Sequence, residues 1–205
     1  VDADLGAVAC AEPLAVCLHA ARIAGDIAGK RVLITGAGPI GALCTAVAAH
    51  EGASEIVVTD LQDAALEVAA RMGATRCINV MRDSAALAEY EADKGHFDLV
   101  FECSAVESAI RSAIASLRPR GTLVQVGVAG DTPMPMNAIV AKEITLQGSF
   151  RFHEEFGQAV DAISSGRINV LPISTQPFPL DQASEAFAVA AEGSQAVKVH
   201  LSFLR

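Results

Sequence analysis

The stretch that decides the fold is residues 31–41, which read RVLITGAGPIG. A short apolar strand here leads through a glycine pattern, GxGxxG, into the start of a helix. In this pattern Gly36 allows a tight turn, Gly38 lets a ligand approach the backbone, and Gly41 lets helix and strand pack closely. Pro39 suits the first helical turn because the N–H that it lacks would have no partner there. The remaining free N–H groups and the helix dipole predict a site for an anion such as a phosphate.

Strands and helices alternate through most of the chain. Short apolar strands are expected at residues 31–35, 55–59, 76–79, 97–102, 121–126 and 144–149. Between most of them, apolar residues recur at the three- and four-residue spacing of one helix face. Apolar strands that alternate with amphipathic helices predict βαβ units and a parallel sheet covered on both faces. The sequence therefore predicts an α/β fold of the Rossmann type, a doubly wound sheet of six parallel strands.

The regular alternation weakens after Ser149. A helix is expected around residues 156–163, ending near Gly166, and a short one from about Asp181, which would cap it. The last expected strand, residues 196–203, alternates apolar and other side chains, so it requires one buried and one wet face, unlike the inner strands. We therefore divide the chain into a linker with a leading helix (1–29), a Rossmann domain (30–150) and a C-terminal segment (151–205) that belongs to a different packing unit.

Composition narrows the class of partner. The net charge of −9 argues against binding to nucleic acid or to an anionic membrane. No apolar run approaches the roughly 20 residues of a membrane-spanning helix. Five cysteines without a CxxC motif indicate neither a disulfide framework nor a structural zinc site, which favours reduced thiols in a cytoplasmic protein. The hydrophobic fraction of 52%, in a chain that begins mid-pattern at Val1, suggests a buried sheet, an oligomer interface, or a surface that meets a segment outside this sequence.

An acidic residue, Asp60, ends the second expected strand, EIVVTD, 24 residues after Gly36. A carboxylate at that place accepts hydrogen bonds from the ribose hydroxyls of NAD and repels the additional phosphate of NADP. The next residues, Leu61 and Gln62, offer no cation to that phosphate. The alternative is a surface acid that merely ends a strand. Strand, glycine loop and acid together favour NAD as the cofactor.

Several segments resemble, in order, the cofactor domain of the medium-chain dehydrogenases. They read GKRVLITGAGPIG, VTD, FDLVFECSA, GTLVQVGV and KEITLQGSFRF. Within that superfamily the sequence resembles the zinc-dependent polyol branch, which includes sorbitol and L-idonate 5-dehydrogenases. AEPLAVCLHAA, GSFRF and AVKVHLSF are most similar to the L-idonate group. The resemblance covers residues 11–203 and implies that an N-terminal catalytic lobe lies outside this sequence. It also implies an enzyme that oxidises a secondary alcohol of a polyol or sugar acid, with L-idonate favoured, using NAD and zinc.

The resemblance assigns cofactor contacts residue by residue. The adenosine and pyrophosphate side is implied for Gly36, Gly38, Pro39, Ile40, Gly41 and Asp60, and the nicotinamide side for Val126, Gly127, Val128, Ser149, Phe150 and Arg151. Arg151 and the following Phe152 also face the substrate in that branch. Sorbitol dehydrogenases often have Tyr at the latter position, so the missing hydroxyl makes sorbitol less favoured. The basic residue that usually follows the acid by about five positions is absent, since Ala64 and Ala65 stand there.

Glu12, in the sequence Glu-Pro-Leu, matches the acid beside the catalytic zinc of the polyol branch. The resemblance makes it a candidate catalytic residue and a candidate zinc ligand, with the other ligands outside this chain. The alternative is an acid favoured by the dipole at a helix N-terminus. The five histidines do not cluster with cysteine or with one another, so a zinc site within this chain alone is not expected.

The sequence also gives expectations for single side chains and for assembly. His19 is expected to be structural and Cys103 to be a buried spectator thiol, while Arg151 has ion pairing with Glu154 or Glu155 as its alternative. In the family the strand at residues 144–149 lies at the sheet edge and pairs with a second subunit, which implies a homodimer or homotetramer.

Other functional classes also remain open. They are a different zinc alcohol, sorbitol or threonine-type dehydrogenase, a zinc-free reductase of the same superfamily, and a non-catalytic NAD-binding module. Glu12 and Asp60 speak against the zinc-free reductases, which usually use NADPH.

Overall fold

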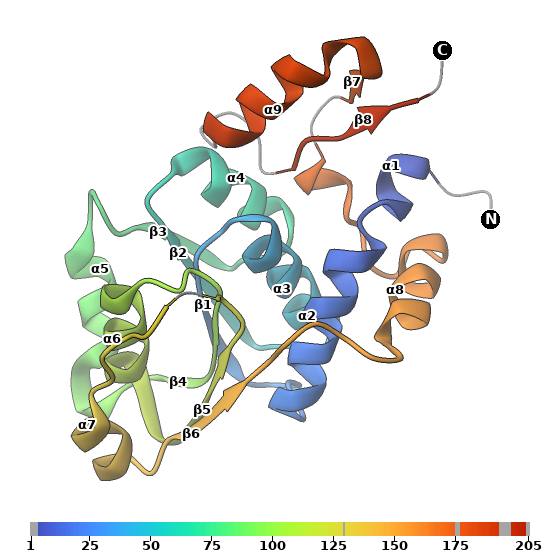
Figure 1. The fold of residues 1–205 in the computed structure, drawn as a ribbon. Coiled ribbons are helices and arrows are strands. Elements are labelled where there is room, and N and C mark those ends of the chain that lie inside the picture. The colour runs from blue at the N-terminus through green and yellow to red at the C-terminus, as the bar shows by residue number, and fades with distance from the viewer. Residues whose placement is uncertain (1–3, 129, 175–176, 193–197, 204–205) are drawn as a thin grey trace.

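The computed structural model describes residues 4–128, 130–174, 177–192 and 198–203. Six parallel strands form its central sheet in the order β3-β2-β1-β4-β5-β6 (Figure 1). Their bounds are β1 Arg31–Thr35, β2 Glu55–Asp60, β3 Arg76–Asn79, β4 Phe97–Glu102, β5 Leu117–Gln125 and β6 Thr145–Gly148. The order runs outward in both directions from β1 and β4, which are hydrogen-bonded neighbours. The predicted doubly wound fold is confirmed, and it places a topological switch point between β1 and β4.

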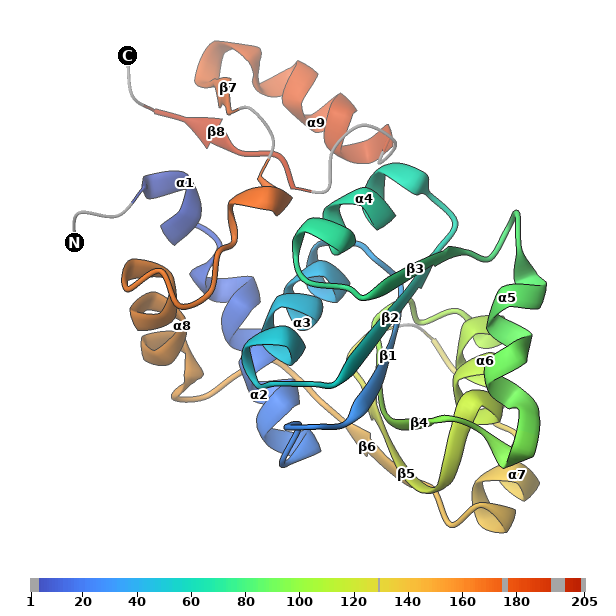
Figure 2. The ribbon, with the colours of Figure 1, turned by 180° about the vertical axis from the view of Figure 1, so that it is seen from behind.

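Helices cover both faces of the sheet (Figures 1 and 2). One face carries α2 (Ala11–Ala24), α3 (Pro39–His50) and α4 (Asp63–Arg71), and the other carries α5 (Ser84–Ala88), the 3-10 helix η1 (Glu89–Lys94), α6 (Glu107–Ser116) and α7 (Met136–Ala141). In β1, Val32 and Ile34 join the core on the first face, and Leu33 joins the core on the second. Successive side chains of a strand point to opposite faces, so a sheet covered on both sides requires a continuous apolar run such as VLI.

One strand begins earlier than the sequence indicates. β5 starts at Leu117, directly after α6, whereas the strand was expected at residues 121–126. Leu117 pairs with Phe97, and the register then shifts before Leu99 pairs with Thr122. Arg120 within this irregular stretch has a positive φ of 63°. Residues 118–120 therefore form an irregular stretch within β5, and the residues on either side of it, Leu117 and Thr122, pair with β4.

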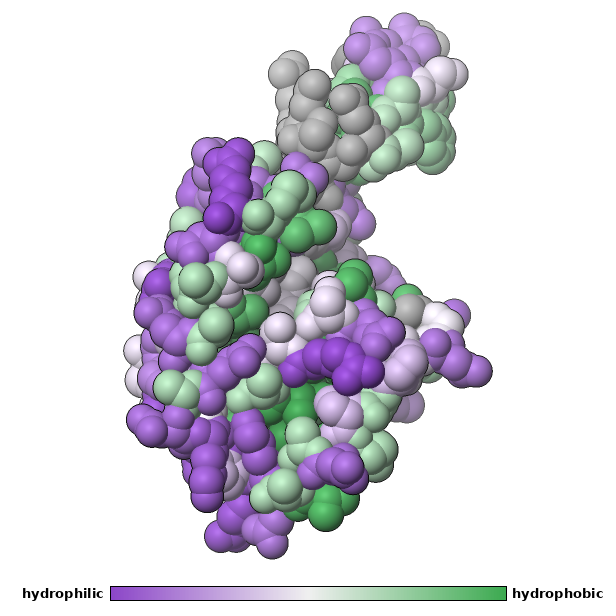
Figure 3. Space-filling model, turned by 90° about the vertical axis from the view of Figure 1, so that its left-hand side faces the viewer, coloured by the Kyte–Doolittle hydropathy of each residue, from purple (hydrophilic) through white to green (hydrophobic). Residues whose placement is uncertain are grey.

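The C-terminal segment divides into two parts. Its helix α8 (Glu155–Ser164) packs against α2, and Ala159, Ala162 and Ile163 belong to the same core as the first face of the sheet. This half of the segment therefore packs against the Rossmann domain, whereas the sequence predicts a separate packing unit for the whole segment. Beyond it lie α9 (Ala183–Glu192) and a two-stranded sheet of β7 (Phe178–Pro179) and β8 (Leu201–Ser202). Figure 3 shows this last part projecting beyond the main body.

The projecting part contains less regular secondary structure than the sequence predicts. Only Leu201–Ser202 of the expected strand 196–203 form β8, with a single bridge between Ser174 and Lys198 before it, and residues 196–197 lie outside the described residues. Asp181 lies inside a 3-10 turn, Leu180–Gln182, that leads into α9, so it does not cap the helix. Phe187 and Phe203 are 71% and 75% exposed. Exposed apolar side chains also occur elsewhere, at Val128, Val140 and Phe150, so the expected apolar interaction surface stays a prediction.

The linker helix α2 and the C-terminal helix α8 are joined by a buried carboxylate. Glu155 is fully buried, and its Oε1 lies 3.1 Å from His19 Nδ1 and 2.6 Å from Arg22 Nε. The backbone N–H of His153 donates to Glu155 Oε2 at 2.7 Å. His19 is thus a buried structural residue, as predicted. A buried charge is tolerated when it is paired and hydrogen-bonded in this way.

We expect Glu155 to make stability depend on pH. Burial by itself raises the pKa of this carboxyl, but hydrogen bonds from the His153 N–H and the His19 ring, with the Arg22 charge, lower it to about 2. A depressed pKa contributes stability that is present above the unfolded value of about 4.3 and is lost as the pH falls through the folded value. Near pH 7, Glu155→Gln should be less stable than wild type by about 1–3 kcal/mol.

Urea unfolding at a series of pH values measures this contribution. The stability difference between wild type and Glu155→Gln should shrink as the pH falls from about 4.5 toward 2. A difference that is the same at both ends of this range would contradict the assignment.

Among the described residues, none of the helices is long and apolar enough to cross a membrane.

Candidate cofactor site

The three glycines of the loop between β1 and α3 have three different surroundings. Gly36 has a φ of +87°, and a Cβ there would lie 3.1 Å from the backbone N of Ser104. A Cβ on Gly41 would lie 1.8 Å from the carbonyl oxygen of Gly36. A Cβ on Gly38 would meet nothing within 4 Å. The loop therefore needs Gly36 for its turn and Gly41 for packing, while Gly38 borders open space that a ligand can enter.

The helix α3 begins without a side chain that caps it. Gly38 is its N-cap residue, Pro39 occupies the first turn, and no side-chain hydrogen bond reaches the first N–H groups. Ile40 is half-buried, and its carbonyl oxygen accepts a hydrogen bond from the Cys17 thiol at 3.4 Å, which ties the first turn to α2. The first N–H groups of a helix have no intrahelical partner. The start of α3 thus has free N–H groups of the kind that can bind an anion, and its role in binding a phosphate stays a prediction.

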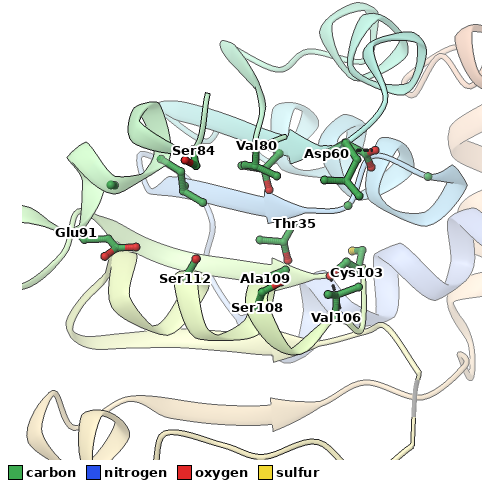
Figure 4. Close-up of a pocket in the computed structure, with 17 residues that line it drawn as sticks. Thr35, Asp60, Val80, Ser84, Glu91, Cys103, Val106, Ser108, Ala109 and Ser112 are labelled. Atoms are coloured by element: carbon green, nitrogen blue, oxygen red, sulfur yellow. Dashed lines mark hydrogen bonds between the residues drawn. The ribbon is translucent and has the colours of Figure 1, made fainter. Parts of the chain in front are cut away.

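A cavity of about 580 Å³ opens beside this loop, at the switch point between β1 and β4. Figure 4 shows Asp60 at one end and Glu91 at the other, with Thr35, Ser108 and Ser112 between them. The size lies within the usual range for small-molecule sites, roughly 300–1,000 Å³. The polar end with Ser84, Ser108, Ser112 and Glu91 was not found from the sequence, because these residues come from α5, η1 and α6 and share no motif.

Asp60 is held rigidly at the mouth of the cavity. Its Oδ2 accepts a hydrogen bond from the N–H of Ala37 at 2.6 Å. Its Oδ1 accepts from Leu61 N at 2.7 Å and from Gln62 N at 2.9 Å. The acid that ends β2 thus contacts the glycine loop after β1, as the spacing predicts. Within the part of the chain that the structure describes, neither Lys nor Arg lines this cavity.

The residues expected on the nicotinamide side follow β5 and β6, at the same edge of the sheet. Val126 is buried and Val128 is exposed, and both Val126 N and Gly127 N donate to the Glu102 carbonyl at 2.8 Å. Ser149 is buried, and its N–H donates to the Gln125 carbonyl at 2.8 Å. In the described part of the chain, none of these residues belongs to the lining of the 580 Å³ cavity. Their role in binding a cofactor stays a prediction.

Arg151 and Phe150 form an exposed pair. The Arg151 guanidinium lies 5.3 Å from the centre of the Phe150 ring, and Arg151 has a φ of +59°. Left-handed backbone is uncommon for a residue other than glycine and occurs often at functional sites. Of the two adjacent acids, Glu154 lies 3.7 Å from Arg22, and Glu155 also pairs with that residue. The alternative that Arg151 pairs with these acids is not seen in the described residues.

Glu12 is exposed in the first turn of α2. No group of three or more His, Cys, Asp or Glu side chains that could hold a metal occurs in the described ranges. One exposed carboxylate does not make a zinc site, which needs three or four ligands. The described residues therefore do not fit zinc by themselves, and any zinc would need ligands from beyond this chain. Within the described part of the chain, Glu12 and Arg151 form neither a hydrogen bond nor an ion pair with each other.

The Cys103 thiol lines the cavity beside the glycine loop and lies 3.9 Å from Cys44 Sγ. Its hydrogen bond to Cys44 and its burial raise the pKa of Cys103 well above the usual range. A thiol becomes a nucleophile only as the thiolate. Cys103 is only partly buried, so the prediction of a buried thiol is wrong, while its raised pKa agrees with the predicted spectator role.

Sequence reasoning missed one buried acid in this region. Glu102 ends β4, is fully buried, and accepts a hydrogen bond from Thr35 Oγ1 at 3.1 Å. The signal was present: an acid ends the otherwise apolar strand FDLVFE in the same way that Asp60 ends EIVVTD. Both acids stand at the carboxyl edge of a parallel sheet, where ligands bind in this class of fold.

Comparison with known proteins places this geometry in a family. Residues 39–165 match the family model described as zinc-binding dehydrogenase. L-idonate 5-dehydrogenase (NAD(P)(+)) of Escherichia coli K12 is 42% identical over 202 residues, which make up 98% of this chain and 58% of that protein. Sorbitol dehydrogenase 1 of Saccharomyces cerevisiae is 36% identical over 200 residues, covering 93% of this chain and 56% of that protein.

The fold agrees with the sequence comparison. The crystal structure of L-idonate 5-dehydrogenase from E. coli matches with a TM-score of 0.94 and 41% identity, over 99% of this chain and 58% of that one. The chain thus spans less than three fifths of the length of these relatives. The family model covers well over half of the chain. The chain belongs to the zinc-binding dehydrogenase family.

Proposed function

We propose that this chain is the cofactor-binding part of an NAD-dependent dehydrogenase that oxidises a secondary alcohol of a sugar acid or polyol. The oxidation of L-idonate to 5-ketogluconate is the favoured reaction. The observation that carries the proposal is the uncapped start of α3, with Gly38 open to space, beside a cavity with Asp60 at its mouth. The L-idonate and sorbitol dehydrogenases that this chain resembles supply the substrate class.

In this proposal the backbone does most of the binding. The N–H groups at the start of α3 face the pyrophosphate, and Asp60, already fixed by three backbone N–H groups, accepts from the ribose hydroxyls. The residues after β5 and β6, Gly127 and Ser149 among them, orient the nicotinamide end. The bound nicotinamide supplies the acceptor for a hydride.

Selectivity for NAD over NADP rests on charge. Asp60 would lie next to the additional phosphate of NADP, and the described lining of the cavity contains no cation to offset that repulsion. Arg82, one of the nearby cations, pairs with Asp63 at 2.5 Å. The E. coli relative carries both cofactors in its name, so members of this group differ in how strictly they choose.

Arg151 and Glu12 are proposed for the substrate side. A guanidinium matches the planar carboxylate of a sugar acid, and the Arg151 side chain is exposed and stacked on Phe150, which limits its motion. Phe152 stacks with Phe156 at 5.9 Å and offers no hydroxyl to a polyol, which supports a sugar acid over sorbitol. Glu12 would act together with metal ligands from beyond this chain.

A calorimetric titration of the chain with NADH and, separately, NADPH tests the cofactor assignment. NADH should bind, and NADPH should bind at least about tenfold more weakly, a difference of ~1.4 kcal/mol. The chain contains no Trp that could report binding by energy transfer to the nucleotide, so heat is the suitable signal. Equal affinity for both nucleotides would remove the NAD preference. Absence of heat with either would remove the cofactor site from this chain.

A second arm of this test measures chemistry. The described residues do not build a zinc site, so the chain alone should not reduce NAD in the presence of L-idonate above background. NAD-dependent oxidation of L-idonate by these 205 residues alone would contradict the proposal that the chain binds the cofactor and needs metal ligands from beyond it.

The edge strand β6 leads us to expect a dimer. All four of its residues are exposed, Leu146 among them, and its described pairing is with β5 on one side. An open apolar edge pairs readily with another strand, and a charge on the edge opposes that pairing. We expect the chain to sediment as a dimer at tens of micromolar and Leu146→Lys to sediment as a monomer. Leu171→Lys, an equal change at an exposed site away from β6, is the control. A monomeric wild type would contradict the prediction.

A further inference from the structure

A buried glutamate connects three strand ends beneath the proposed cofactor site. Glu102 at the end of β4 is fully buried. Its carboxylate accepts from Thr35 Oγ1 at the end of β1 and from the Gln125 side-chain amide at the end of β5. It also accepts from the hydroxyl and the N–H of Ser104, which follows β4. These donors lie 67, 23 and 2 residues away in the sequence, so one carboxylate links three separate loops.

The same carboxylate holds a strained residue. Ala105 has a φ of +57°, in the left-handed region that favours glycine. Its N–H donates to both carboxylate oxygens of Glu102, at 3.1 and 2.9 Å. A residue other than glycine keeps such a conformation only where the surrounding structure fixes it. Here the fixing group is Glu102.

The strained turn is in contact with the loops on either side of it. A Cβ on Gly36 would lie within 3.2 Å of Ser104, so the glycine loop rests on this turn. A Cβ on Gly127 would lie 2.7 Å from Ala105 N, so the loop after β5 rests on it from the other side. The Gln125 amide, besides donating to Glu102, donates to the Gly127 carbonyl at 2.9 Å. A shift of the Ser104–Ala105 turn would therefore move both neighbouring loops.

We propose that Glu102 is a positioning residue for the cofactor: it fixes the turn on which the pyrophosphate loop at Gly36 and the nicotinamide-side loop at Gly127 both rest. It touches no cofactor itself and acts through Ser104, Ala105 and Gln125. The inference rests on the proposed function for its consequence in binding, but its structural part concerns this chain alone.

A carboxylate suits this position, because each of these groups donates to it and a carboxylate offers acceptor sites on both of its oxygens. An amide has nearly the same shape, but its NH₂ group would face the N–H of Ala105 and the amide of Gln125. Glu102→Gln therefore preserves the volume of the side chain and removes one of its two acceptor oxygens, which makes it the informative substitution.

The matched control is Glu155→Gln. Glu155 is also a fully buried, hydrogen-bonded glutamate, but it joins α2 to α8 and lines none of the loops at the switch point. Both variants should unfold more easily than wild type. Only Glu102→Gln should change the loops and the nucleotide affinity, so the comparison separates positioning from general destabilisation.

Amide hydrogen exchange on the ligand-free proteins is the first measurement. In Glu102→Gln, exchange should rise at least tenfold in residues 36–38, 103–106 and 126–128, with α4 and α8 unchanged. In Glu155→Gln it should rise in α2 and α8 instead. Equal protection of the three loops in Glu102→Gln and wild type would overturn the proposal. This result does not depend on whether the chain binds NAD.

NADH titration, well below the unfolding temperature of each variant, is the second measurement. Glu102→Gln should bind NADH at least tenfold more weakly, and Glu155→Gln should bind as wild type does. If wild type binds no NADH, the proposed function fails while the exchange result still decides the role of Glu102. If the loops loosen but NADH affinity is unchanged, the positioning role is overturned. Should Glu102→Gln not fold, Gln125→Met removes one neutral donor and should loosen residues 126–128 alone.

Discussion

Gly38→Ala should fold like the wild type and lose NADH binding, whereas Gly41→Ala should lose the fold of the loop itself. A Cβ on Gly38 meets nothing within 4 Å, and its φ is negative, so alanine is accepted in the free chain. The same methyl group would occupy the space through which a pyrophosphate approaches the backbone. We expect at least tenfold weaker binding of NADH, ~1.4 kcal/mol or more, with the melting temperature unchanged.

Gly41→Ala tests packing against helix propensity. Alanine in place of glycine within a helix usually adds about 0.5–1 kcal/mol of stability. Here the new Cβ would lie 1.8 Å from the Gly36 carbonyl oxygen, a backbone atom that cannot move aside without opening the turn. Overpacking of this kind costs about 1–3 kcal/mol or more. The clash is larger than the gain in propensity, so the variant should be destabilised and should not bind NADH.

Gly157→Ala in α8 is the control for both substitutions. It lies within a helix, with nothing within 4 Å of an added Cβ, and far from the switch point. It should stabilise the chain by roughly 0.5–1 kcal/mol and leave NADH affinity unchanged. Thermal unfolding and calorimetry on the three variants decide the matter. A Gly38→Ala variant that binds NADH normally would show that no ligand backbone contact is made there.

Inner strands such as β1, β2 and β4 could be predicted from the sequence because each is local and mostly buried. RVLIT, EIVVT and FDLVFE contain the short apolar runs VLI, IVV and LVF that a two-sided core requires, and the glycine loop fixes how the first of them connects to a helix. Asp60 could be predicted for the same reason: its place depends only on the end of β2 and the right-handed order of the strands.

Glu102 and the polar end of the cavity could not be predicted from single segments. Glu102 has partners 67 and 23 residues away in the sequence, and the hydroxyls of Ser84, Ser108 and Ser112 meet only after α5 and α6 have packed on the sheet. Nothing local in FDLVFECSA distinguishes an acid that organises three loops from one that merely ends a strand. Such roles become visible only when the strand ends are placed side by side.

The C-terminal segment illustrates a different limit. The period of its apolar residues predicted α8 correctly, but the partner surface of that helix is α2, a segment more than 130 residues away in the sequence. The buried link through His19 and Glu155 decides where the helix packs. Periodicity gives the face that is buried and leaves open which other surface buries it.

Replacing Asp60 should change which nucleotide the chain prefers. In Asp60→Asn one oxygen remains as an acceptor, but the new NH₂ group opposes an N–H of Ala37 or of Leu61 and Gln62, and the charge is gone. Loss of charge-assisted hydrogen bonds to the ribose, about 1.5–3 kcal/mol each, should weaken NADH binding ten- to a hundredfold. NADPH loses the repulsion at the same time, so its affinity should fall little or rise.

The stronger form of this prediction adds a cation. Asp60→Ser combined with Leu61→Arg removes the negative charge and places a guanidinium at the exposed position next to it, where it can bind the additional phosphate. The preference should then reverse in favour of NADPH, as measured by calorimetry with both nucleotides. Glu67→Gln is the control, because it removes an equal charge from an exposed side chain of α4, outside the cavity lining. It should leave the ratio of the two affinities unchanged.

The ratio is the informative quantity, because any damage to the loop weakens both nucleotides together and cancels in it. If Asp60→Asn weakens NADH and NADPH by the same factor, Asp60 supports the glycine loop through Ala37 and does not choose the cofactor. If Glu67→Gln shifts the ratio as much as Asp60→Asn does, the choice comes from the general negative charge of this part of the surface. Only a shift confined to Asp60 and its neighbour assigns the choice to one carboxylate at the end of β2.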